Sequence, residues 1–530
     1  KNKKFTMKRL FTLILVLCVL NSLAQNIGEL NTDFGSDGSY IFEPSTAHDF
    51  LEKILIQDDG KILTVGKARV DGSKYSIYVS RHNADGTLDA TYRDGGIAYF
   101  KATPNIYMNC AFDAELNDDG LLFVTGYTFD YSNNSAFILC LDENGFEYTD
   151  FGDNGYAISD YGHGIVYEAI DIDTDGRPIV AGYYDDQILV RRHDTNGTLD
   201  STFGDNGTSI IILDSTPWAY CYAYDIEALE DGKIIVAGHK VSADMLYESY
   251  LLRLNADGTL DDTFADNGVL YINAGEYAEY ATTIDVQTDG KYLVGGHDDL
   301  LTYAPYPRCE SYITRVNTDG TIDETFGNHG FVKIEQFSGD GCTNECYSVM
   351  AAPDGQIFGT VYSYNHNSLA TRAYVYNLDE NGQFKEDFAG TGIMVLPQIE
   401  NEELKITTSS LALQNDSNLL VGGYIASDNN SNQELFMSCV SVDIENGEDI
   451  GELTSSLLLY PNPVKDQLHI AIESRIEDIA VYDVYGRLQD NMTTRLQDGI
   501  NVDVSNLHSG VYFVMIKSDN KTLIEKFIKQ

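Results

Sequence analysis

DGKIIVAG (231–238) followed by NADGTLDDTFADNG (255–268) is the stretch of sequence that decides the fold of this chain. Its first half, an Asp-Gly turn leading into an apolar strand that ends in Gly, recurs at 59–66, 119–126, 175–182, 231–238 and 289–296, with weaker copies at 354–361 and 416–423. Its second half carries an aromatic residue that recurs at Phe34, Tyr92, Phe151, Phe203, Phe264, Phe326 and Phe388, every 52–62 residues. Such periods are typical of repeat architectures, in which stacked units bury faces that no single unit could bury.

Each period holds four strand-like segments. Examples are YEAIDID (167–173), PIVAGYY (178–184), QILVRRH (187–193) and TSIIILD (208–214), joined by turns in which Gly stands beside Asp or Asn. These residues suit tight turns that need a positive φ. Four antiparallel strands per repeat of about 60 residues predict a propeller blade. The sequence therefore predicts an all-β, seven-bladed β-propeller over residues 28–447.

The two halves of the repeat are out of phase at the ends of this region. Phe34 and a strand near residues 39–43 precede the first complete unit, whereas the seventh unit, from about 405 to 445, lacks a closing segment. We expect the N-terminal strand to complete the last blade, because this removes the exposed sheet edge of an open ring. A linear β-solenoid is the alternative, but it does not explain why the extra piece matches the missing one.

These repeats resemble the delta-60 repeat family of bacterial surface and secreted proteins. The family pattern is near DGKILVAG, then R-x-N-x-DG-x-LD-x-x-FG-x-x-G, and the resemblance covers roughly residues 28–447. Copies six and seven depart most from it. The resemblance implies a propeller without a well-defined shared activity.

The C-terminal segment has a different periodicity. After a polar linker at 448–456, alternating apolar residues in LLLYPNPVKDQLHIAI (457–472), IEDIAVYDVYGRLQ (476–489) and INVDVSNLHSGVYFVMI (500–516) predict a small antiparallel, Ig-like β-sandwich over 457–530. The segment is similar to the C-terminal sorting domain of type IX secretion substrates. The matching elements are Tyr460-Pro461-Asn462-Pro463, Val481-Tyr482-Asp483 with Gly486, Leu507 with Gly510-Val511-Tyr512, and the Lys-rich last strand.

This resemblance implies type IX secretion machinery as a partner of residues 457–530 and a location outside a diderm bacterium, either secreted or attached to the outer cell surface. An ordinary Ig-like adhesion module is the alternative. The N-terminus agrees with export: Lys8 and Arg9 precede a mainly apolar run from Leu10 to Leu20 and then small residues up to Ala24. This order predicts a signal peptide over residues 7–24. A lipoprotein anchored at Cys18 is the alternative, and the sequence predicts no transmembrane segment.

The charge of the chain narrows the classes of partner. Its 34 basic and 82 acidic residues give a formal net charge of −48. Such a surface repels nucleic acid and anionic lipid, and favours cations and basic surfaces. We therefore expect no nucleic-acid partner.

Seven cysteines follow the signal peptide, namely Cys110, Cys140, Cys221, Cys309, Cys342, Cys346 and Cys439. An odd number cannot pair completely, and a disulfide among Cys309, Cys342 and Cys346 stays open. A metal site there would lack a matching CxxC or His pair. Cys140, inside the apolar run FILCL, is interpreted as a core thiol.

Common catalytic motifs do not occur in a strand-helix context, so the chain is more readily interpreted as a binding protein than as an enzyme. No cofactor is predicted. Calcium stays open, because Asp171-x-Asp173-x-Asp175-Gly176 copies the first half of a calcium loop, although the twelfth position is Gly182. The innermost strands also carry alternating carboxylates that we expect to face a hydrated axial channel or a metal ion; they are Asp113, Glu115, Asp171, Asp173, Asp225, Glu227 and Asp285.

A ring of side chains is the predicted ligand-binding site. Aligning the blades on the Asp-Gly turn places one residue per blade at the end of the second strand: Lys67, Tyr127, Tyr183, His239, His297, Tyr362 and Tyr424. Variable aromatic loops adjoin the ring, at 107–109, 161–163, 218–224, 277–280 and 303–306. The loop at 218–224 contributes Trp218, Tyr220 and Tyr222 to the predicted site. Aromatic side chains with polar tips suit sugar stacking and protein contacts. The favoured function is recognition of a glycan or protein; the alternatives are an extracellular polysaccharide hydrolase or lyase and a structural surface role.

Overall fold

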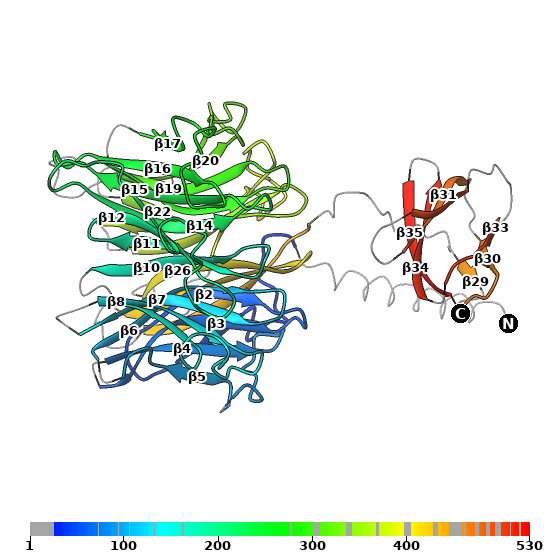
Figure 1. The fold of residues 1–530 in the computed structure, drawn as a ribbon, viewed down its shortest axis with the longest axis horizontal. Coiled ribbons are helices and arrows are strands. Elements are labelled where there is room, and N and C mark those ends of the chain that lie inside the picture. Colours follow the sequence, from blue (N-terminus) through cyan, green and yellow to red (C-terminus); the bar gives the residue numbers. More distant parts are fainter. Residues whose placement is uncertain are drawn as a thin grey trace, which may run out of the picture. The chain divides into compact units, whose positions relative to one another are not determined.

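A computed structural model of the chain describes residues 26–72, 74–93, 95–104, 106–130, 134–160, 164–275, 278–300, 308–334, 342–366, 370–396, 404–427, 433–444, 458–460, 463–471, 476–483, 488–492, 500–508, 510–518 and 521–529. Its contacts divide into two units, residues 1–444 and 445–530, and each is described by itself. All secondary-structure elements of the described residues are β-strands (Figure 1). The predicted all-β class is confirmed.

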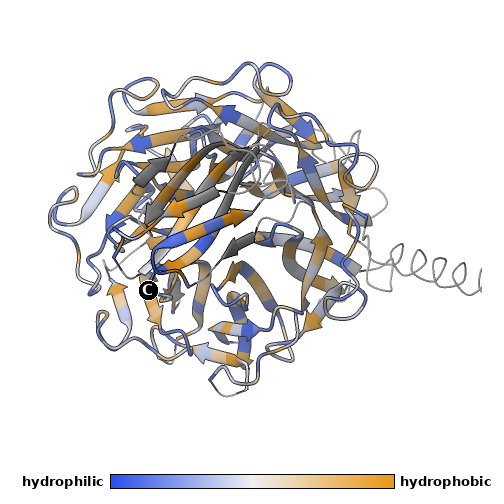
Figure 2. Ribbon diagram, turned by 90° about the vertical axis from the view of Figure 1, so that its right-hand side faces the viewer, coloured by the Kyte–Doolittle hydropathy of each residue, from blue (hydrophilic) through white to orange (hydrophobic). Residues whose placement is uncertain are grey.

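The first unit consists of seven four-stranded antiparallel sheets, which form the blades around a central axis (Figure 2). Blade 1 contains β2 (Asp49–Ile56), β3 (Ile62–Asp71), β4 (Lys74–His82) and β5 (Ile97–Phe100); blade 2 contains β6 (Met108–Leu116), β7 (Leu122–Phe129), β8 (Asn134–Leu141) and β9 (Tyr156–Ser159). Blade 3 contains β10 (Ile165–Ile172), β11 (Pro178–Tyr184), β12 (Gln187–Arg192) and β13 (Thr208–Ile211); blade 4 contains β14 (Tyr220–Ala228), β15 (Ile234–Val241), β16 (Tyr247–Leu254) and β17 (Val269–Ile272). Blade 5 contains β18 (Ala278–Val286), β19 (Tyr292–Leu300), β20 (Arg308–Val316) and β21 (Phe331–Ile334); blade 6 contains β22 (Cys342–Ala351), β23 (Ile357–Asn365), β24 (Ala370–Leu378) and β25 (Ile393–Val395). Blade 7 contains β26 (Leu404–Asn415), β27 (Asn418–Ser427), β28 (Gln433–Ser441) and β1 (Ser39–Phe42).

The N-terminal strand closes the ring. Strand β1 pairs with β28 in an antiparallel register from Ser39 opposite Ser438 to Phe42 opposite Leu435, and so becomes the fourth strand of blade 7. The segment before β1 adds a further backbone bond, from the amide of Gly28 to the carbonyl of Ser441 at 2.7 Å. The described sheets therefore follow the closed arrangement expected from the offset repeats, and not a solenoid.

Apolar side chains fill the spaces between adjacent blades. One buried cluster combines Val65 and Ile77 of blade 1 with Val124 and Phe137 of blade 2, and the other clusters of the first unit join neighbouring blades in the same way. Burial between sheets, and not within one sheet, therefore supplies most of the apolar stabilisation.

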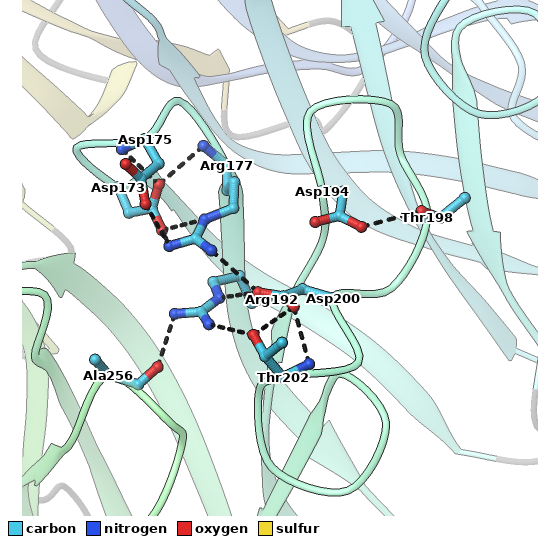
Figure 3. Close-up of polar contacts among 9 residues, drawn as sticks. All are labelled: Asp173, Asp175, Arg177, Arg192, Asp194, Thr198, Asp200, Thr202 and Ala256. Carbon is cyan, nitrogen blue, oxygen red and sulfur yellow. Dashed lines mark hydrogen bonds and ion pairs between the residues drawn. The ribbon is translucent and has the colours of Figure 1, made fainter.

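The second half of the repeat builds a polar contact between blades, which we call the Arg-Asp latch. In blade 3, Nε of Arg192 donates to Oδ2 of Asp200 at 2.7 Å, and the same guanidinium donates to the carbonyl of Ala256 in blade 4 at 2.8 Å (Figure 3). The guanidinium also lies over the ring of Phe203, 4.9 Å from its centroid. Equivalent latches begin at Arg81, Arg253 and Arg315. The recurring Asp and aromatic residues of the repeat are therefore parts of the interface between blades.

The seven described cysteines are all buried thiols outside any disulfide. Sγ of Cys309 donates to the carbonyl of Asn344 at 3.2 Å, and Cys342 accepts a bond from Asn365. The structure shows no disulfide among the described Cys309, Cys342 and Cys346, which the sequence left open, and the Cys309 thiol contacts the neighbouring blade.

The second unit contains two antiparallel sheets. One consists of β29 (Leu458–Tyr460), β30 (Gln467–Ala471) and β33 (Ile500–Asp503), and the other of β31 (Ile476–Asp483), β32 (Leu488–Met492), β34 (Gly510–Ser518) and β35 (Lys521–Lys529). Side chains of both sheets, such as Leu468, Val502 and Val514, share one apolar core. This packing agrees with the predicted small β-domain, while its Ig-like topology stays a prediction.

Two predicted segments lie outside the described residues, namely the signal peptide at 7–24 and the linker at 448–456. In the part of the chain that the structure describes, no helix has the length and apolar character of a membrane span.

Candidate ligand-binding face and axial cavity

The two ends of the propeller carry different kinds of loop. Because the strands of a blade are antiparallel, the turns between strands one and two and between strands three and four lie at one end, which we call the repeat-turn face. The opposite end, the variable-loop face, carries the turns between strands two and three and the connections between blades. Of the variable loops named from the sequence, 161–163 and 303–306 lie outside the described residues.

Side chains of the repeat-turn face are occupied with their own turns. Asp85 accepts bonds from the amide and the hydroxyl of Thr87, at 3.0 and 2.6 Å, and Asp257 does the same with Thr259. These bonds lower the pKa of both Asp85 and Asp257. The repeating residues of this face therefore serve the fold.

The predicted ring residues occupy one register position in all seven blades. Each pairs with a residue of the innermost strand, in the order Lys67 with Phe50, Tyr127 with Cys110, Tyr183 with Val166, His239 with Tyr222, His297 with Tyr280, Tyr362 with Glu345, and Tyr424 with Thr407. The structure thus places the seven residues as a ring at the variable-loop face. Their role in ligand binding stays a prediction.

Blades 4 and 5 gather the ring into an aromatic sector. Tyr280 lies between the two histidines, with its ring centroid 4.7 Å from that of His239 and 4.7 Å from that of His297. Tyr222 bridges His239 to Tyr183, at 5.3 and 4.8 Å between centroids. Burial lowers the pKa of His239 to about 3 and also lowers that of His297. Both imidazoles are therefore neutral near pH 7, and the Nδ1 atoms of both are buried without a hydrogen-bonding partner.

The other side of the ring is charged. Nζ of Lys67 lies 2.8 Å from Oε1 of Glu52 and sits between two aromatic rings, 4.9 Å from the centroids of both Phe50 and Phe112. Tyr127 stacks on Phe112 at 5.3 Å, and Tyr424 meets Phe50 edge to face at 5.1 Å. These contacts pack the ring residues against the innermost strands.

Every innermost strand contains a β-bulge at the same height. A bulge places one extra residue opposite its partner strand and turns that side chain out of the regular alternation. The seven bulge residues are Glu52, Phe112, Glu168, Tyr224, Thr282, Tyr347 and Ser409, and all seven line a cavity of about 280 Å³ on the propeller axis. Sequence alternation missed this set.

Carboxylates and one ammonium line the deeper part of this axial cavity. Nζ of Lys53 lies 2.9 Å from Oδ1 of Asp113, and Asp225, Glu227 and Asp285 are further lining residues. Several carboxylates also join neighbouring blades. Oδ2 of Asp113, Asp171, Asp225 and Asp285 accepts a backbone N–H from Ile170, Ala228, Ile284 and Ala351, respectively.

Burial is the main cause of the unusual acidities on the axis. It raises the pKa of Glu168 and of Asp225 to about 7, and that of Glu227 well above its usual value. Burial raises the pKa of Glu115 to about 7 as well, in a second pocket that opens toward the repeat-turn face and also includes Lys53. An axial carboxyl with a pKa near 7 exists in both protonation states at neutral pH.

One sequence expectation about acidic residues needs correction. Asp173 does not face the channel; it lies in the turn after β10, where its carboxylate accepts from Nε of Arg177 at 2.9 Å (Figure 3). Arg177 also pairs with Asp175 at 2.9 Å, while Asp171 bonds the neighbouring blade. In the segment that resembles half a calcium loop, the carboxylates of Asp173 and Asp175 therefore pair with Arg177. The carboxylate of Asp171 accepts a hydrogen bond from a backbone amide of the next blade.

The rim of blade 4 exposes apolar side chains. Trp218 is 89% exposed, and Met245 and Leu246 in the β15–β16 hairpin are 56% and 63% exposed. Trp218 and Met245 have φ values of 74° and 61°, a region that bulky side chains rarely adopt. Tyr220, whose pKa is raised to about 12 by its hydrogen-bonding contact with Tyr247, links the two loops.

Comparison with known families identifies parts of the repeat region and most of the second unit. A family described as "Domain of unknown function (DUF5122) beta-propeller" matches residues 57–92, 174–203, 229–264 and 287–326, and a family described as "Secretion system C-terminal sorting domain" matches residues 458–530. The chain is a β-propeller with a type IX sorting domain. Both resemblances read from the sequence are confirmed. The sorting domain assigns this propeller protein to type IX export, and hence to a secreted or cell-surface location, with the secretion machinery as a partner.

Solved structures similar to this propeller protein share low sequence identity with it. The polysaccharide lyase Uly1 has a TM-score of 0.44 at 9% identity, over 78% of this chain and 92% of the lyase. The GH74 xyloglucanase from Xanthomonas campestris has a TM-score of 0.38 at 11% identity, over 82% and 60%. The β-propeller domain of the Trilobed protease from Pyrococcus furiosus has a TM-score of 0.35 at 11% identity, over 78% and 100%. Likeness of this degree carries no argument about function, and no curated protein matches the chain.

Proposed function

We propose that this exported propeller is a recognition protein that binds a glycan or a protein outside the cell through its variable-loop face. The supporting observation is the rim of blade 4, where Trp218 is 89% exposed at a φ of 74°. Holding a bulky side chain in this conformation costs on the order of 1 kcal/mol or more, and such strain persists where function maintains it. The ligand-binding residues are Lys67, Tyr127, Tyr183, His239, His297, Tyr362, Tyr424, Trp218, Tyr220 and Tyr222.

The difference between the two faces also supports the proposal. Exposed aromatic residues with polar tips contribute roughly 1–2 kcal/mol or more each to sugar or protein binding. The turns of the opposite face use their Asp side chains to hold themselves. After export, the propeller acts as a released or surface-attached binder.

Glycan and protein arrays probed with the secreted full chain test this function. We expect a specific ligand whose affinity falls at least about tenfold in Trp218→Ala and further when Tyr220→Ala and Tyr222→Ala are added. Phe146→Ala is the matched control, because Phe146 is an aromatic residue that is 51% exposed in a turn of the repeat-turn face. Equal losses in the control and in Trp218→Ala would contradict the assignment of the face.

An extracellular polysaccharide hydrolase or lyase is the second candidate. Burial raises the pKa of Glu168 to about 7. Burial also raises the pKa of Tyr127 and of Tyr183, and the negative charge of Glu168 adds to this increase. A carboxyl of this acidity could exchange protons with a bound substrate at neutral pH. Release of reducing or unsaturated ends from a glycan panel, lost in Glu168→Gln, would establish this alternative.

A further inference from the structure

We propose that the axial cavity binds a primary ammonium group on an aliphatic chain, inserted from the variable-loop face. The ligand is either a lysine side chain of a peptide or a free polyamine, since both present the same chemistry. This site lies on the propeller axis, Trp218 is not among its lining residues, and the inference does not depend on the proposed function.

The charge of the cavity is the first argument. Its charged lining residues are Glu52, Asp113, Glu168, Asp225, Glu227, Asp285 and Lys53. Lys67 pairs with Glu52 at 2.8 Å and Lys53 pairs with Asp113 at 2.9 Å. Among the described residues, the other four carboxylates form no salt bridge, although Lys67 lies near Glu168 and Lys53 near Asp225, Glu227 and Asp285. Glu168 and Glu227 have no hydrogen-bonding partner in the same part of the chain either, although a buried carboxylate is costly without one.

The chain itself demonstrates which cation the channel stabilises. Lys53 is an alkylammonium held on the axis, and although burial acts in the opposite direction, Asp113, Glu115 and Asp225 raise its pKa well above the usual value. The same position in blades 5, 6 and 7 carries Thr283, Ser348 and Ser410. Blade 1 therefore supplies the ammonium of Lys53, whereas Asp225 and Glu227 of blade 4 and Asp285 of blade 5 form no salt bridge among the described residues.

The rim of the cavity suits the stem of such a ligand. Phe112, Tyr224 and Tyr347 are bulge residues that line the opening, and Met350 and Leu411 add apolar surface below them. Aromatic faces attract an ammonium and pack against its methylene groups. A volume of about 280 Å³ lies just below the range of about 300–1,000 Å³ for drug-sized ligands, so a small aliphatic amine fits.

A metal ion fits less well. Among the described residues, no three His, Cys, Asp or Glu side chains converge as metal ligands. Asp225 and Asp285 point their Oδ2 atoms at backbone amides of the next blade. Separated carboxylates with aromatic neighbours match an ammonium, which donates hydrogen bonds in three directions.

Binding of the ammonium should release protons. Glu168 faces Lys67 and Glu52, whereas Glu227 faces Asp171, Asp225, Asp285 and Lys53. A cation among these groups favours their charged forms and lowers their pKa values. Since burial holds the pKa of Glu168 and Asp225 at about 7, the affinity should rise from pH 6 to pH 8, while an amine with a pKa of about 10 stays protonated.

Titration calorimetry of the secreted full chain tests the proposal with three probes at pH 6 and pH 8. The probes are spermidine, a capped Gly-Lys-Gly peptide, and the same peptide with an acetylated lysine. We expect the amine probes to bind more tightly at pH 8 and the acetylated peptide to bind at least about tenfold more weakly. Binding of only the lysine peptide assigns a peptide source, and binding of only spermidine assigns a free polyamine.

Variants localise the site. Glu227→Gln and Glu168→Gln should each weaken amine binding about fivefold or more, whereas Glu230→Gln, at an exposed position of the repeat-turn face, should not. Trp218→Ala should leave amine binding unchanged, which separates this site from the blade 4 rim. Spermidine should also raise the thermal midpoint of Lys53→Met more than that of the unaltered chain. Absence of amine binding at both pH values, or equal binding of the acetylated peptide, would overturn the proposal.

Discussion

Phe34 of blade 7 lies directly against Gly86 of blade 1, so that a Cβ atom on Gly86 would meet the Phe34 ring at 2.6 Å. The same contact recurs around the ring, between Tyr92 and Gly145 and between Phe326 and Gly382. Phe34 precedes the first complete repeat, yet it performs the task that the second-half aromatic performs elsewhere. The amide of Gly35 reinforces this contact by donating to the carbonyl of Asp85 at 2.7 Å.

Replacement of Gly86 should therefore weaken ring closure. Gly86→Ala adds a methyl group against Phe34 and strains a residue whose φ is 85°. Gly60→Ala is the matched control, because Gly60 has a φ of 80° and nothing within 4 Å of an added Cβ. We expect Gly86→Ala to lower the free energy of unfolding by about 1–3 kcal/mol more than the control. Equal effects in thermal or denaturant unfolding would show that the contact contributes nothing beyond backbone strain.

Loss of one latch carboxylate should destabilise the propeller. Oδ2 of Asp261 accepts from Nε of Arg253 at 2.7 Å and from Nζ of Lys233 at 2.8 Å. Removing one partner of a buried ion pair costs about 3–5 kcal/mol, so Asp261→Asn should lower the thermal midpoint clearly. Asp257→Asn, in the exposed turn of the same blade, should change stability by about 0.5 kcal/mol or less. Differential scanning calorimetry of both variants distinguishes an essential latch from a dispensable one.

The axial carboxyls predict an unusual dependence of stability on pH. Burial raises the pKa of Asp225 to about 7 and that of Glu227 well above its usual value. The folded state thus binds more protons than the unfolded state, and the stability that this contributes is present at low pH and is lost as the pH rises through about 7. We expect the thermal midpoint to fall between about pH 5 and pH 8, and to fall less in Glu227→Gln. A midpoint that rises with pH over this range would contradict the burial of these groups.

The sorting domain gives a prediction about location. Residues 458–530 match the secretion family and form a separate unit in the contacts. Deletion of residues 454–530 should leave a folded propeller that stays in the periplasm. Fractionation with immunoblotting checks this, with protease resistance of the trapped protein as the measure of folding. Normal amounts of the truncated protein in the medium or on the cell surface would contradict the expectation.

The blades were predictable because their signals are local. Each signal, whether an Asp-Gly turn, an apolar strand or a recurring aromatic residue, depends only on residues close together in the sequence. The position of Phe34 before the first complete unit was enough to predict that β1 pairs with the last blade. The Arg-Asp latch also has a signal in the sequence, since Arg192 stands at a fixed spacing before Asp200, as Arg81 does before Asp89. Its partner in the next blade is distant in sequence, so only the structure reveals the contact.

The axial cavity was less predictable, because a β-bulge shifts the alternation of a strand by one residue. Simple alternation from Asp171 leads to Asp173, which lies in a turn, and overlooks Glu168, which the bulge turns toward the axis. The sequence of β10 alone does not reveal the bulge. The bulge has the same position in every blade: its residue follows, by two positions in the sequence, the innermost-strand residue that pairs with the ring residue. Aligning the seven innermost strands on this pairing therefore identifies the seven bulge residues.

The strand that closes the ring sets the order of folding. The hydroxyls of Ser39 and Ser438 lie 2.8 Å apart, although 399 residues separate them in sequence. Strand β1 can pair only when the last repeat is present beside it, so it waits longer for its partner than any other strand of the propeller. Six blades have complete sets of strands before the seventh does. The last step of folding is therefore the pairing of the N-terminal strand β1 with β28. Until then β1 stays unpaired and the apolar face of blade 1 that packs on blade 7 stays uncovered, and in this interval the chain is most exposed to association with other chains.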